Sequence, residues 1–289
     1  MNAQSPDSCT SLLCLCWLSC FGLAAAFVSP AVRADDERSE LRVLCYNIHY
    51  GQGNDKRYDI ERLADVINKA KPDLVALQEA DVGVERSGRV HQIRRLAKLT
   101  GMAARFGPTQ HFEGGLFGNA VLTRLPILDV AIHPLPYTES TPELVTFPRG
   151  AIAVMLRGRD GKPLRFISTH FQHNVAEDRV AEAKTINRLF ARDDDVPTIL
   201  AGDMNSKPDD EPIQLLLKHW SDASDEPASP TAPATHPTSR IDYIFYRPAG
   251  RLRVIRAEVI DESMASDHRP VLAVFRISET IPERPVDCK

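Results

Sequence analysis

Short apolar runs alternate along the chain with segments in which apolar residues recur every three or four positions. The first two runs, 41–47 and 73–79, predict strands, and between them Asp59 precedes a segment with the apolar spacing of a helix. A second helical pattern begins at Val90 and stops at Gly101, a residue type that often ends helices. The chain therefore opens with a strand, helix, strand unit followed by another helix.

The rest of the pattern adds more strands and two more helices. Strand-like runs occupy 120–123, 151–156, 164–169, 198–201, 241–246, 252–259 and 271–275, and helical patterns occupy 176–191 and 213–217. A turn around Asp160-Gly161 joins two of these runs and predicts a hairpin, so antiparallel pairing enters the sheet. Residues 225–240 hold four prolines and predict a loop. Mixed sheets between helical layers in one α/β domain fit this order.

Composition narrows the class of protein. The chain has 289 residues, 43% of them hydrophobic and 26% charged, which is close to the average for soluble globular proteins and excludes a disordered or collagen-like chain. Lys and Arg number 35 against 39 Asp and Glu, a formal net charge of -4. No overall basic field exists to hold nucleic acid or anionic lipid nonspecifically, so any polyanionic substrate must be bound locally.

The N-terminal segment predicts export. Residues 12–28 carry no charge, and Val32-Arg33-Ala34 places small residues where a signal peptidase reads them, just before Asp35. We therefore expect residues 1–34 to be a secretory signal, 35–276 to be the catalytic domain and 277–289 to be a frayed tail. A secreted or periplasmic location follows, with a retained N-terminal membrane anchor as the alternative.

Cysteine usage gives no support for structural zinc. Four of the six cysteines lie within residues 1–34, and the chain contains no Cys-x-x-Cys pair and no cluster of Cys and His. Cys45 lies inside an apolar strand pattern and Cys288 is the penultimate residue. A buried, inert thiol and a free thiol in the tail are expected.

Polar and ionisable side chains gather where the predicted strands end. They are Asn47 with His49, Glu79, His170, Asp203 with Asn205 and, at the entry to the last strand, Asp267 with His268. Any one of them has an ordinary explanation, because Asp and Asn commonly end strands through turn chemistry. As a set they describe a pocket rich in oxygen ligands for a hard cation, with imidazole bases beside it. Open α/β sheets keep their sites at such strand ends.

The run 199–205 is the most informative of these strand ends. An apolar strand leads into Gly202, where the backbone can bend close to a ligand, and then presents Asp203 and Asn205 on the same side. Asp203 is suited to accept a proton from water, and Asn205 to donate to a phosphate oxygen. Asp242 is the one acid in an otherwise apolar strand, and a buried carboxylate requires a partner, for which His268 is the natural candidate.

Six motifs in this order resemble the endonuclease/exonuclease/phosphatase superfamily, the metal-dependent phosphoesterases related to pancreatic deoxyribonuclease. The resemblance spans about residues 41–276. Its motifs are the opening strand that ends in Asn47, the Leu-Gln-Glu of Glu79, the Ser-Thr-His of His170, the Gly-Asp-x-Asn of Asp203 and Asn205, the Ile-Asp-Tyr-Ile-Phe of Asp242, and the Ser-Asp-His-Arg-Pro of Asp267 and His268. These motifs do not select a subfamily.

The resemblance implies both a fold and a cofactor. The expected fold is a four-layer α/β sandwich, in which two packed mixed β-sheets are flanked by helices. The expected cofactor is Mg2+, with Mn2+ as an alternative. Carried over to this chain, Glu79 is the principal metal ligand, and Asn47 and Asp267 lie close enough to assist.

The resemblance also implies roles for five residues around the metal. Asp203 and Asn205 would orient or deprotonate the attacking water and brace the phosphate. His268, held by Asp242, and His170 would stabilise charge on the phosphoryl oxygens or protonate the leaving oxygen. Which histidine is the acid, and whether Asp203 or His268 takes the proton of the water, is open at this point.

Two further residues are candidates for substrate binding. Arg149 precedes a predicted strand and either reaches a substrate phosphate or has a surface role. His173 follows His170 by three positions, a spacing that makes a metal pair on a helix but not at a strand end, so we place it at the rim of the site. Arg86, Arg89, Arg94 and Arg95 are interpreted mostly as a solvated helix face. For four aromatic residues a rim that contacts a base or a lipid is the alternative, but packing is the preferred interpretation, because single aromatic residues near loops more often pack: Phe112, Phe117, Tyr137 and Trp220.

The sequence therefore favours a secreted Mg2+-dependent phosphoesterase that hydrolyses a phosphodiester, or a phosphomonoester, by direct attack of water. Small or lipid-linked substrates are preferred, because basic residues are scattered and do not form a track for a polyanion. A secreted nuclease acting on DNA or RNA is the alternative. The alternative from another class is a noncatalytic binding module that kept the fold. It is disfavoured because every motif position still holds a residue that can do the chemistry. No protein partner is evident.

Overall fold

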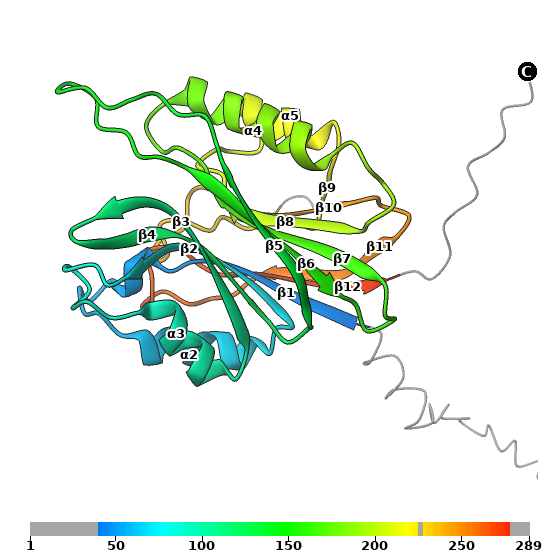
Figure 1. Cartoon of the computed structure of the whole chain (residues 1–289), viewed down its shortest axis with the longest axis horizontal. Coiled ribbons are helices and arrows are strands. Elements are labelled where there is room, and N and C mark those ends of the chain that lie inside the picture. The colour runs from blue at the N-terminus through cyan, green and yellow to red at the C-terminus, as the bar shows by residue number, and fades with distance from the viewer. Residues whose placement is uncertain (1–39, 225–227, 278–289) are drawn as a thin grey trace, which may run out of the picture. The chain divides into compact units, whose positions relative to one another are not determined.

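Two mixed β-sheets of six strands form the centre of the part of the protein that the computed structural model describes, residues 40–224 and 228–277 (Figure 1). The first sheet has the order β11-β12-β1-β2-β4-β3 and the second the order β5-β6-β7-β8-β10-β9. The strands of the first sheet are β1 (Glu40–Asn47), β2 (Leu74–Val82), β3 (Ala103–Phe112), β4 (Gly115–Thr123), β11 (Leu252–Val259) and β12 (Val271–Ile277). Those of the second are β5 (Ile127–Pro134), β6 (Gly150–Arg157), β7 (Pro163–His170), β8 (Thr198–Asp203), β9 (Ser221–Asp222) and β10 (Asp242–Arg247).

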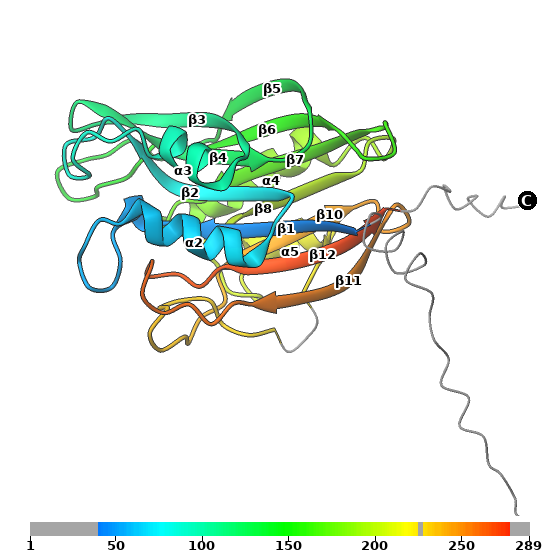
Figure 2. The same ribbon diagram turned by 90° about the horizontal axis from the view of Figure 1, so that it is seen from below.

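Helices cover the outer face of each sheet (Figures 1 and 2). They are α2 (Ile60–Ala70) and α3 (Gln92–Thr100) on the first sheet, and α4 (Ala176–Phe190) and α5 (Glu211–Leu217) on the second, with a short 3-10 helix, η1 (His49–Gly51), after β1. The order of layers is thus helix, sheet, sheet, helix. This arrangement confirms the expected four-layer α/β sandwich.

The first helix forms where its cap and its apolar spacing predict it. The side chain of Asp59 accepts a hydrogen bond of 2.9 Å from the backbone N–H of Arg62, which satisfies one of the free donors at the start of α2. Leu63 and Ile67, one turn apart, are buried against the first sheet. The helix α3 ends as expected at Gly101, whose φ of 65° is in the left-handed region.

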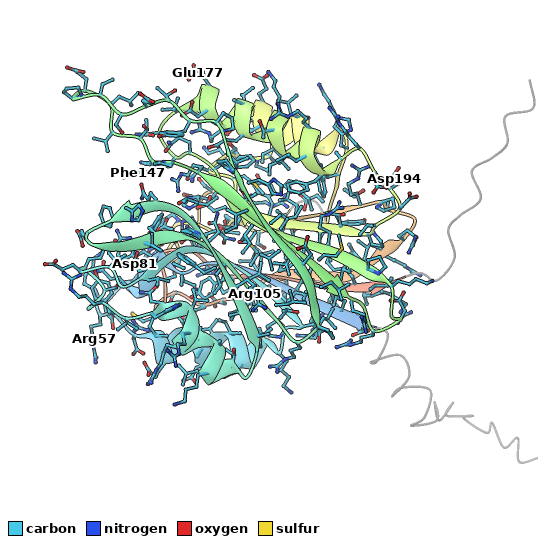
Figure 3. The ribbon with its side chains drawn as sticks, viewed as in Figure 1. Arg57, Asp81, Arg105, Phe147, Glu177 and Asp194 are labelled. Atoms are coloured by element: carbon cyan, nitrogen blue, oxygen red, sulfur yellow. The ribbon has the colours of Figure 1, made fainter. Side chains whose placement is uncertain are left out.

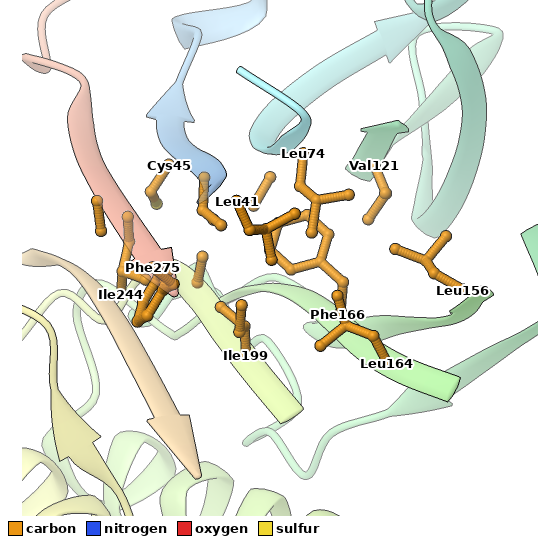
Figure 4. Close-up of a cluster of buried hydrophobic side chains, with 14 of the residues drawn as sticks. Leu41, Cys45, Leu74, Val121, Leu156, Leu164, Phe166, Ile199, Ile244 and Phe275 are labelled. Carbon is orange, nitrogen blue, oxygen red and sulfur yellow. The ribbon is translucent and has the colours of Figure 1, made fainter. Parts of the chain in front are cut away.

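The core between the sheets explains why the central strands are almost continuously apolar. In β1, Leu41, Val43 and Cys45 face the second sheet, while Leu44 and Tyr46 face the helices on the other side. Phe166 and Ile199 meet the first group from the second sheet (Figure 4). A strand that is buried on both faces has no polar side, so its sequence reads as an apolar run. Cys45 is a buried free thiol as expected, and burial raises its pKa.

The predicted strand runs account for the eight inner strands of the two sheets and for one edge strand, β11. The hairpin around Asp160-Gly161 is confirmed, because β6 and β7 pair antiparallel with Leu156 opposite Leu164. Three strands were not expected, namely β3, β5 and β9. The strands β3 and β9 each lie at one edge of a sheet and β5 at another. Edge strands are exposed on more sides and lack the apolar run that identifies a central strand.

Several expectations fall outside the described residues. The signal segment 1–34 and Cys288 lie there, as does the predicted tail, except that β12 reaches Ile277. These expectations stay predictions. The predicted loop at 225–240 is described from residue 228 and holds no helix or extended strand there, only an isolated bridge between Ala232 and Ser239. Within the described residues, no helix has the length and apolar content needed to cross a membrane.

One buried carboxyl group under the second sheet has an incomplete set of partners. Glu182 of α4 is fully buried, and its Oε2 accepts a hydrogen bond of 2.9 Å from the backbone N–H of Gln172. Its Oε1 has no hydrogen-bond partner among the described residues. Burial raises the pKa of Glu182 to about 8, because the opposing effects of the Gln172 N–H and the Arg149 charge are smaller. The folded protein therefore keeps this group protonated at neutral pH.

The raised pKa of Glu182 makes folding stability depend on pH. Between its usual pKa of 4.5 and a pKa of about 8, the unfolded carboxyl is ionised while the folded one holds a proton. Stability that is fully present below pH 4.5 is therefore lost as the pH rises through 8. We expect Glu182→Gln to gain stability relative to the parent as the pH rises, by up to about 4 kcal/mol at pH 8, in denaturant unfolding at a series of pH values.

The control is Glu177→Gln, which changes an exposed carboxyl on the same helix (Figure 3). It should not reproduce the gain in stability with rising pH that is expected of Glu182→Gln. A Glu182→Gln difference that is constant from pH 4.5 to pH 8 would show that the Glu182 carboxyl ionises in the folded protein as it does in the unfolded chain.

Candidate active site

Three ionisable residues lie side by side at one end of the second sheet because of its strand register. In the parallel pair β7 and β8, His170 is opposite Asp203, and in the antiparallel pair β8 and β10, Asp203 is opposite Asp242. All three side chains are buried. Gly202 allows the strands to come this close, since a Cβ at that position would lie 2.2 Å from the carbonyl oxygen of Thr169 in β7.

A hydrogen bond between the two sheets holds the central carboxylate. The carboxamide of Asn47, at the end of β1 in the first sheet, donates from Nδ2 to Asp203 Oδ2 at 3.0 Å and to Glu79 Oε1 at 3.1 Å. The Oδ1 of Asn47 accepts from the backbone N–H of His49 at 3.0 Å, which fixes the orientation of the amide. Asn47 therefore joins a residue of each sheet in one polar cluster.

Glu79 reaches this cluster because β2 is irregular at that point. The register of β2 against β4 shifts between Leu77 and Ala80, and Glu79 has a φ of 58°. A non-glycine residue in the left-handed region is uncommon, and a β-bulge next to a site redirects a side chain. The preceding Gln78 is fully buried and donates to Ser168 Oγ at 3.1 Å, which ties the bulge to the second sheet.

Asp242 and His268 form a buried hydrogen-bonded pair. The Nδ1 of His268 lies 2.9 Å from Asp242 Oδ2, and its Nε2 lies 3.7 Å from Asp203 Oδ2. Burial by itself would lower the pKa of His268, but the charges of Asp242 and Asp203 outweigh it and raise this pKa well above the usual value. The imidazole is therefore held as a cation between two carboxylates, as the sequence suggested for Asp242 and His268.

The pKa of Asp203, on the other side of His268, is also shifted from its usual value. Burial, reinforced by the charge of Asp242 on the neighbouring strand, raises the pKa of Asp203 to about 7. The charge of His268, the backbone N–H of Asn205 at 2.9 Å and the amide of Asn47 act in the opposite direction. A carboxylate with a pKa near neutrality is suited to exchange protons at physiological pH.

His170 lies between two hydrogen-bond donors, but its ring can accept only one hydrogen bond. Arg149 Nη1 lies 3.1 Å from its Nδ1, and Asn205 Nδ2 lies 3.0 Å from its Nε2. Burial, with the charge of Arg149, lowers the pKa of His170 well below its usual value, so the ring is neutral and has a single acceptor nitrogen. Whichever tautomer is present, one N–H directed at the ring, from Arg149 or from Asn205, has no acceptor on His170, although Asn205 Nδ2 also donates to the carbonyl oxygen of Phe171 at 3.0 Å. That N–H can donate to an anionic oxygen.

Arg149 and His173 complete this side of the cluster. Arg149 precedes the body of β6 and is buried, which excludes the surface role that the sequence left open. Its Nη2 lies 3.4 Å from His173 Nδ1. His173 itself is exposed and stacks on Phe147, with ring centroids 5.9 Å apart. This position agrees with the expectation that His173 lies at the rim.

Asp267 lies on the opposite, more open side of the cluster. Its side chain is 41% exposed, and its Oδ1 lies 4.0 Å from His268 Nε2. Its Oδ2 lies 3.7 Å from Nε2 of His49, a residue with a φ of 44° in the strained segment after β1. Ser266 fixes the local backbone by donating from Oγ to the carbonyl oxygen of Asn47 at 2.7 Å.

Two groups of side chains could hold a divalent cation. Ligand atoms of Asp203, Asp242 and His268 lie within 4.8 Å of one another. In that group the His268 imidazole, whose pKa the two carboxylates raise, would have to give up a proton to ligate a metal, which weakens binding there. Glu79 and Asp267 offer carboxylate oxygens and Asn47 an amide oxygen, the ligand type that Mg2+ prefers. The Asn47 amide presents its Nδ2 to Glu79 and its Oδ1 to the His49 N–H, so it would have to turn over to ligate a cation beside Glu79.

The cluster opens into a pocket of about 280 Å³ that is also lined by aromatic and cationic side chains. Five of its lining residues are outside the predicted site residues: Arg86, Gln110, Phe112, Phe117 and Phe147. Arg86 was expected on a solvated helix face, and this expectation is wrong, because Arg86 lies in the loop before α3 and lines the pocket. Packing was the preferred interpretation of Phe112 and Phe117, but both line the pocket, as the alternative of rim aromatic residues required.

The structure brings all ten residues predicted for the site into one connected cluster. They are Asn47, Glu79, Arg149, His170, His173, Asp203, Asn205, Asp242, Asp267 and His268. Their individual roles remain predictions. The sequence did not assign Arg86, Gln110 and Phe147 to the pocket and did not decide between packing and a rim role for Phe112 and Phe117. These residues belong to loops and to the β3–β4 hairpin, and no local pattern shows which way such side chains face.

Comparison with known proteins identifies the superfamily. A model of the endonuclease/exonuclease/phosphatase family matches residues 44–268. A structure of an endonuclease/exonuclease/phosphatase from Beutenbergia cavernae has 26% identity and a TM-score of 0.67, over 83% of this chain and 72% of that one. A search of curated proteins gave no significant match.

Other solved structures share the fold at lower identity. A functionally unknown protein from Enterococcus faecalis has 22% identity and a TM-score of 0.69, over 82% of this chain and 100% of that one. A mannosyl-6-phosphatase from Bacteroides thetaiotaomicron has 21% identity and a TM-score of 0.65, over 81% of this chain and 99% of that one. The family match over most of the chain, together with the fold and the clustered motif residues, shows that this protein belongs to the endonuclease/exonuclease/phosphatase family of metal-dependent phosphoesterases.

Proposed function

We propose that the protein is an exported Mg2+-dependent phosphoesterase that cleaves a phosphodiester, or a phosphomonoester, by direct attack of water. The observation that carries this proposal is the combination, in one pocket, of a buried carboxylate that can accept a proton and of hydrogen-bond donors in excess of the acceptors around them. Such a site binds an anionic tetrahedral group and activates a water beside it.

The cation would be held by Glu79, assisted by Asn47 and Asp267. A bound Mg2+ supplies positive charge that offsets the charge on the phosphoryl and leaving oxygens. Mn2+ suits the same oxygen ligands. The hydrogen bonding of Glu79 supports this assignment. Among the described residues only Asn47 donates to its carboxylate, at Oε1, so Oε2 is free to bind a cation.

Asp203 is the base in this proposal. His268 is cationic beside Asp242 and has no lone pair to accept a proton, whereas the pKa of Asp203 is raised to about 7. Asp203 therefore takes the proton of the attacking water. The His268 imidazolium, 3.7 Å from Asp203 Oδ2, stabilises the negative charge that gathers around the reacting phosphate.

Donors on the other side of Asp203 would brace the phosphoryl group. Arg149 lies at one ring nitrogen of His170 and Asn205 at the other, and only one of these nitrogens is an acceptor. A phosphoryl oxygen would accept the hydrogen bond from the donor that faces the protonated nitrogen. The N–H of neutral His170 is a further donor to such an oxygen or to the leaving oxygen. These contacts are stronger when charge develops on the oxygens, which is the requirement for catalysis.

Small or lipid-linked phosphoesters are the preferred substrates in this proposal. The pocket of about 280 Å³ is the size of a small ligand, and the chain has a net charge of -4 and no basic track. The phosphatase activity named for the Bacteroides thetaiotaomicron protein of similar fold is compatible with a small ester. A nuclease that acts on DNA or RNA is the competing assignment. Export rests on residues 1–34 alone, and intact-mass measurement of exported protein starting at Asp35 tests it.

An activity panel tests the proposed function. We expect hydrolysis of bis-p-nitrophenyl phosphate or p-nitrophenyl phosphate with Mg2+, and loss of that activity with a chelator. Plasmid DNA and sphingomyelin in the same panel separate the nuclease and lipid assignments from the small-ester one. Efficient plasmid nicking with a steep loss of rate on adding salt, and no hydrolysis of small esters, would move the assignment to a nuclease.

Replacement of Glu79 tests the metal site. Glu79→Gln keeps the shape of the side chain but removes one of the few anionic charges that a hard cation retains. We expect weaker Mg2+ binding in calorimetry, about tenfold or more, and a large loss of hydrolysis without a change in unfolding free energy. The control is Glu85→Gln, an exposed carboxyl that pairs with Arg89 outside the pocket. Unchanged Mg2+ binding in Glu79→Gln would remove Glu79 from the metal site.

Asp242 and His268 should act as a unit. Asp242 holds Nδ1 of the imidazole at 2.9 Å and keeps the ring cationic, so Asp242→Asn and His268→Ala remove the same contribution. We expect the double variant to be about as impaired in kcat as the worse single variant. Losses that multiply in a double-mutant cycle of kcat values would show that the two residues act separately.

A further inference from the structure

We infer that the group esterified to the phosphate is a planar aromatic ring, bound between two walls of the pocket next to the reaction site. This inference rests on the proposed function and names the class of its substrate. One wall is formed by Arg86, Phe112 and Phe117, and the other by Phe147 and His173. Both walls line the same pocket as Glu79, His170 and Asp203, so a phosphate bound at the cluster places its ester group between them.

The first wall is a guanidinium group surrounded by rings. The Cζ atom of Arg86 lies 3.7 Å from the centroid of Tyr50, 4.6 Å from that of Phe112 and 5.3 Å from that of Phe117. Guanidinium groups and aromatic rings stack face to face, so this wall offers planar, weakly hydrated surfaces. Phe112 comes from β3 and Phe117 from β4, which form a hairpin at the edge of the first sheet.

Arg86 is fixed and electrically balanced by a buried acid. Its Nε and Nη2 donate to the two carboxylate oxygens of Asp81 at 2.9 Å each, and the Asp81 side chain is fully buried. The pair has no net charge, so this wall has little attraction for a second phosphate of the substrate. The Nη1 of Arg86 carries no hydrogen bond to another described residue and can reach one acceptor atom on a ring substituent.

The second wall is held just as firmly from the other sheet. Phe147 and His173 stack with an angle of 24° between their rings. The carbonyl oxygen of Phe147 accepts a hydrogen bond of 3.1 Å from Gln172, and His173 lies against Arg149. Asp81 and Phe147 lie at the same end of the sandwich, opposite the end marked by Asp194 (Figure 3). The residues of both walls line the one pocket that also contains Glu79, His170 and Asp203.

The shape and chemistry of the walls favour a flat ring over a sugar or a chain. Aromatic rings gain from offset stacking on other rings, a gain that an aliphatic group of the same size lacks. The pocket of about 280 Å³ accommodates one ring beside a phosphate and has no room for a folded polymer. Gln110 at its edge adds one polar group and no charge.

Competitive inhibition by phosphonates tests the inference without any influence of leaving-group reactivity. The probes are phenylphosphonate, cyclohexylphosphonate and methylphosphonate, measured against whichever ester of the activity panel is hydrolysed. We expect phenylphosphonate to inhibit about tenfold or more below the concentration needed for the other two. In Phe112→Ala the preference for phenyl over methyl should fall about three- to tenfold, while inhibition by methylphosphonate stays the same.

The control variant is Tyr137→Ala, an exposed aromatic residue outside the pocket lining. It should leave all three inhibition constants unchanged. Equal inhibition by phenylphosphonate and cyclohexylphosphonate would show that the walls bind apolar bulk or a sugar-like ring, and would overturn the inference. So would a phenyl-to-methyl preference that is unchanged in Phe112→Ala. Absence of hydrolysis of every ester with Mg2+ would instead contradict the proposed function, so the two failures are distinguishable.

Discussion

The hydrogen bond from Asn47 to Asp203 is the constraint on which the site depends, because it joins the ends of the two sheets. Asn47 ends β1 and Asp203 ends β8, and their atoms are 3.0 Å apart although the residues are 156 positions apart in the chain. The same amide also holds Glu79 at 3.1 Å. The relative position of the sheets, set by their shared apolar core, therefore sets the distance between the acid that would bind the metal and the acid that would activate water.

Two carboxylates opposite each other on neighbouring strands would ordinarily destabilise a sheet. Here Asp203 and Asp242 are opposite each other and both buried, and His268 lies close to both. The imidazolium offsets the charge of Asp242 most directly, at 2.9 Å, and leaves Asp203 with a raised pKa. The arrangement that stabilises this end of the sheet is thus also the one that makes Asp203 a base. Glu79, outside this buried triad, is the carboxylate left to a cation.

The sequence predicted the central part of the fold and the residues that cluster at the candidate site because both are marked by local patterns. Apolar runs identified the central strands, and polar residues at their ends identified the site, since strand ends of one sheet meet at one edge. The edge strands β3 and β5 were not predicted because they lack such runs. Arg86 and Phe112 escaped for a different reason: the pocket they line is made by a loop and a hairpin, whose paths depend on tertiary contacts such as the Asp81–Arg86 pair.

The central claim is that the cation binds at Glu79 and that Asp203 is the base, while Asp242 holds His268 as a cation beside it. An anomalous difference map from a crystal of the protein soaked in Mn2+ locates the ion directly. The account predicts a peak within ligand distance of a Glu79 carboxylate oxygen, with Asn47 or Asp267 beside it and with Asp242 still paired to His268. A peak between Asp203, Asp242 and His268, with the hydrogen bond of 2.9 Å broken, would contradict it.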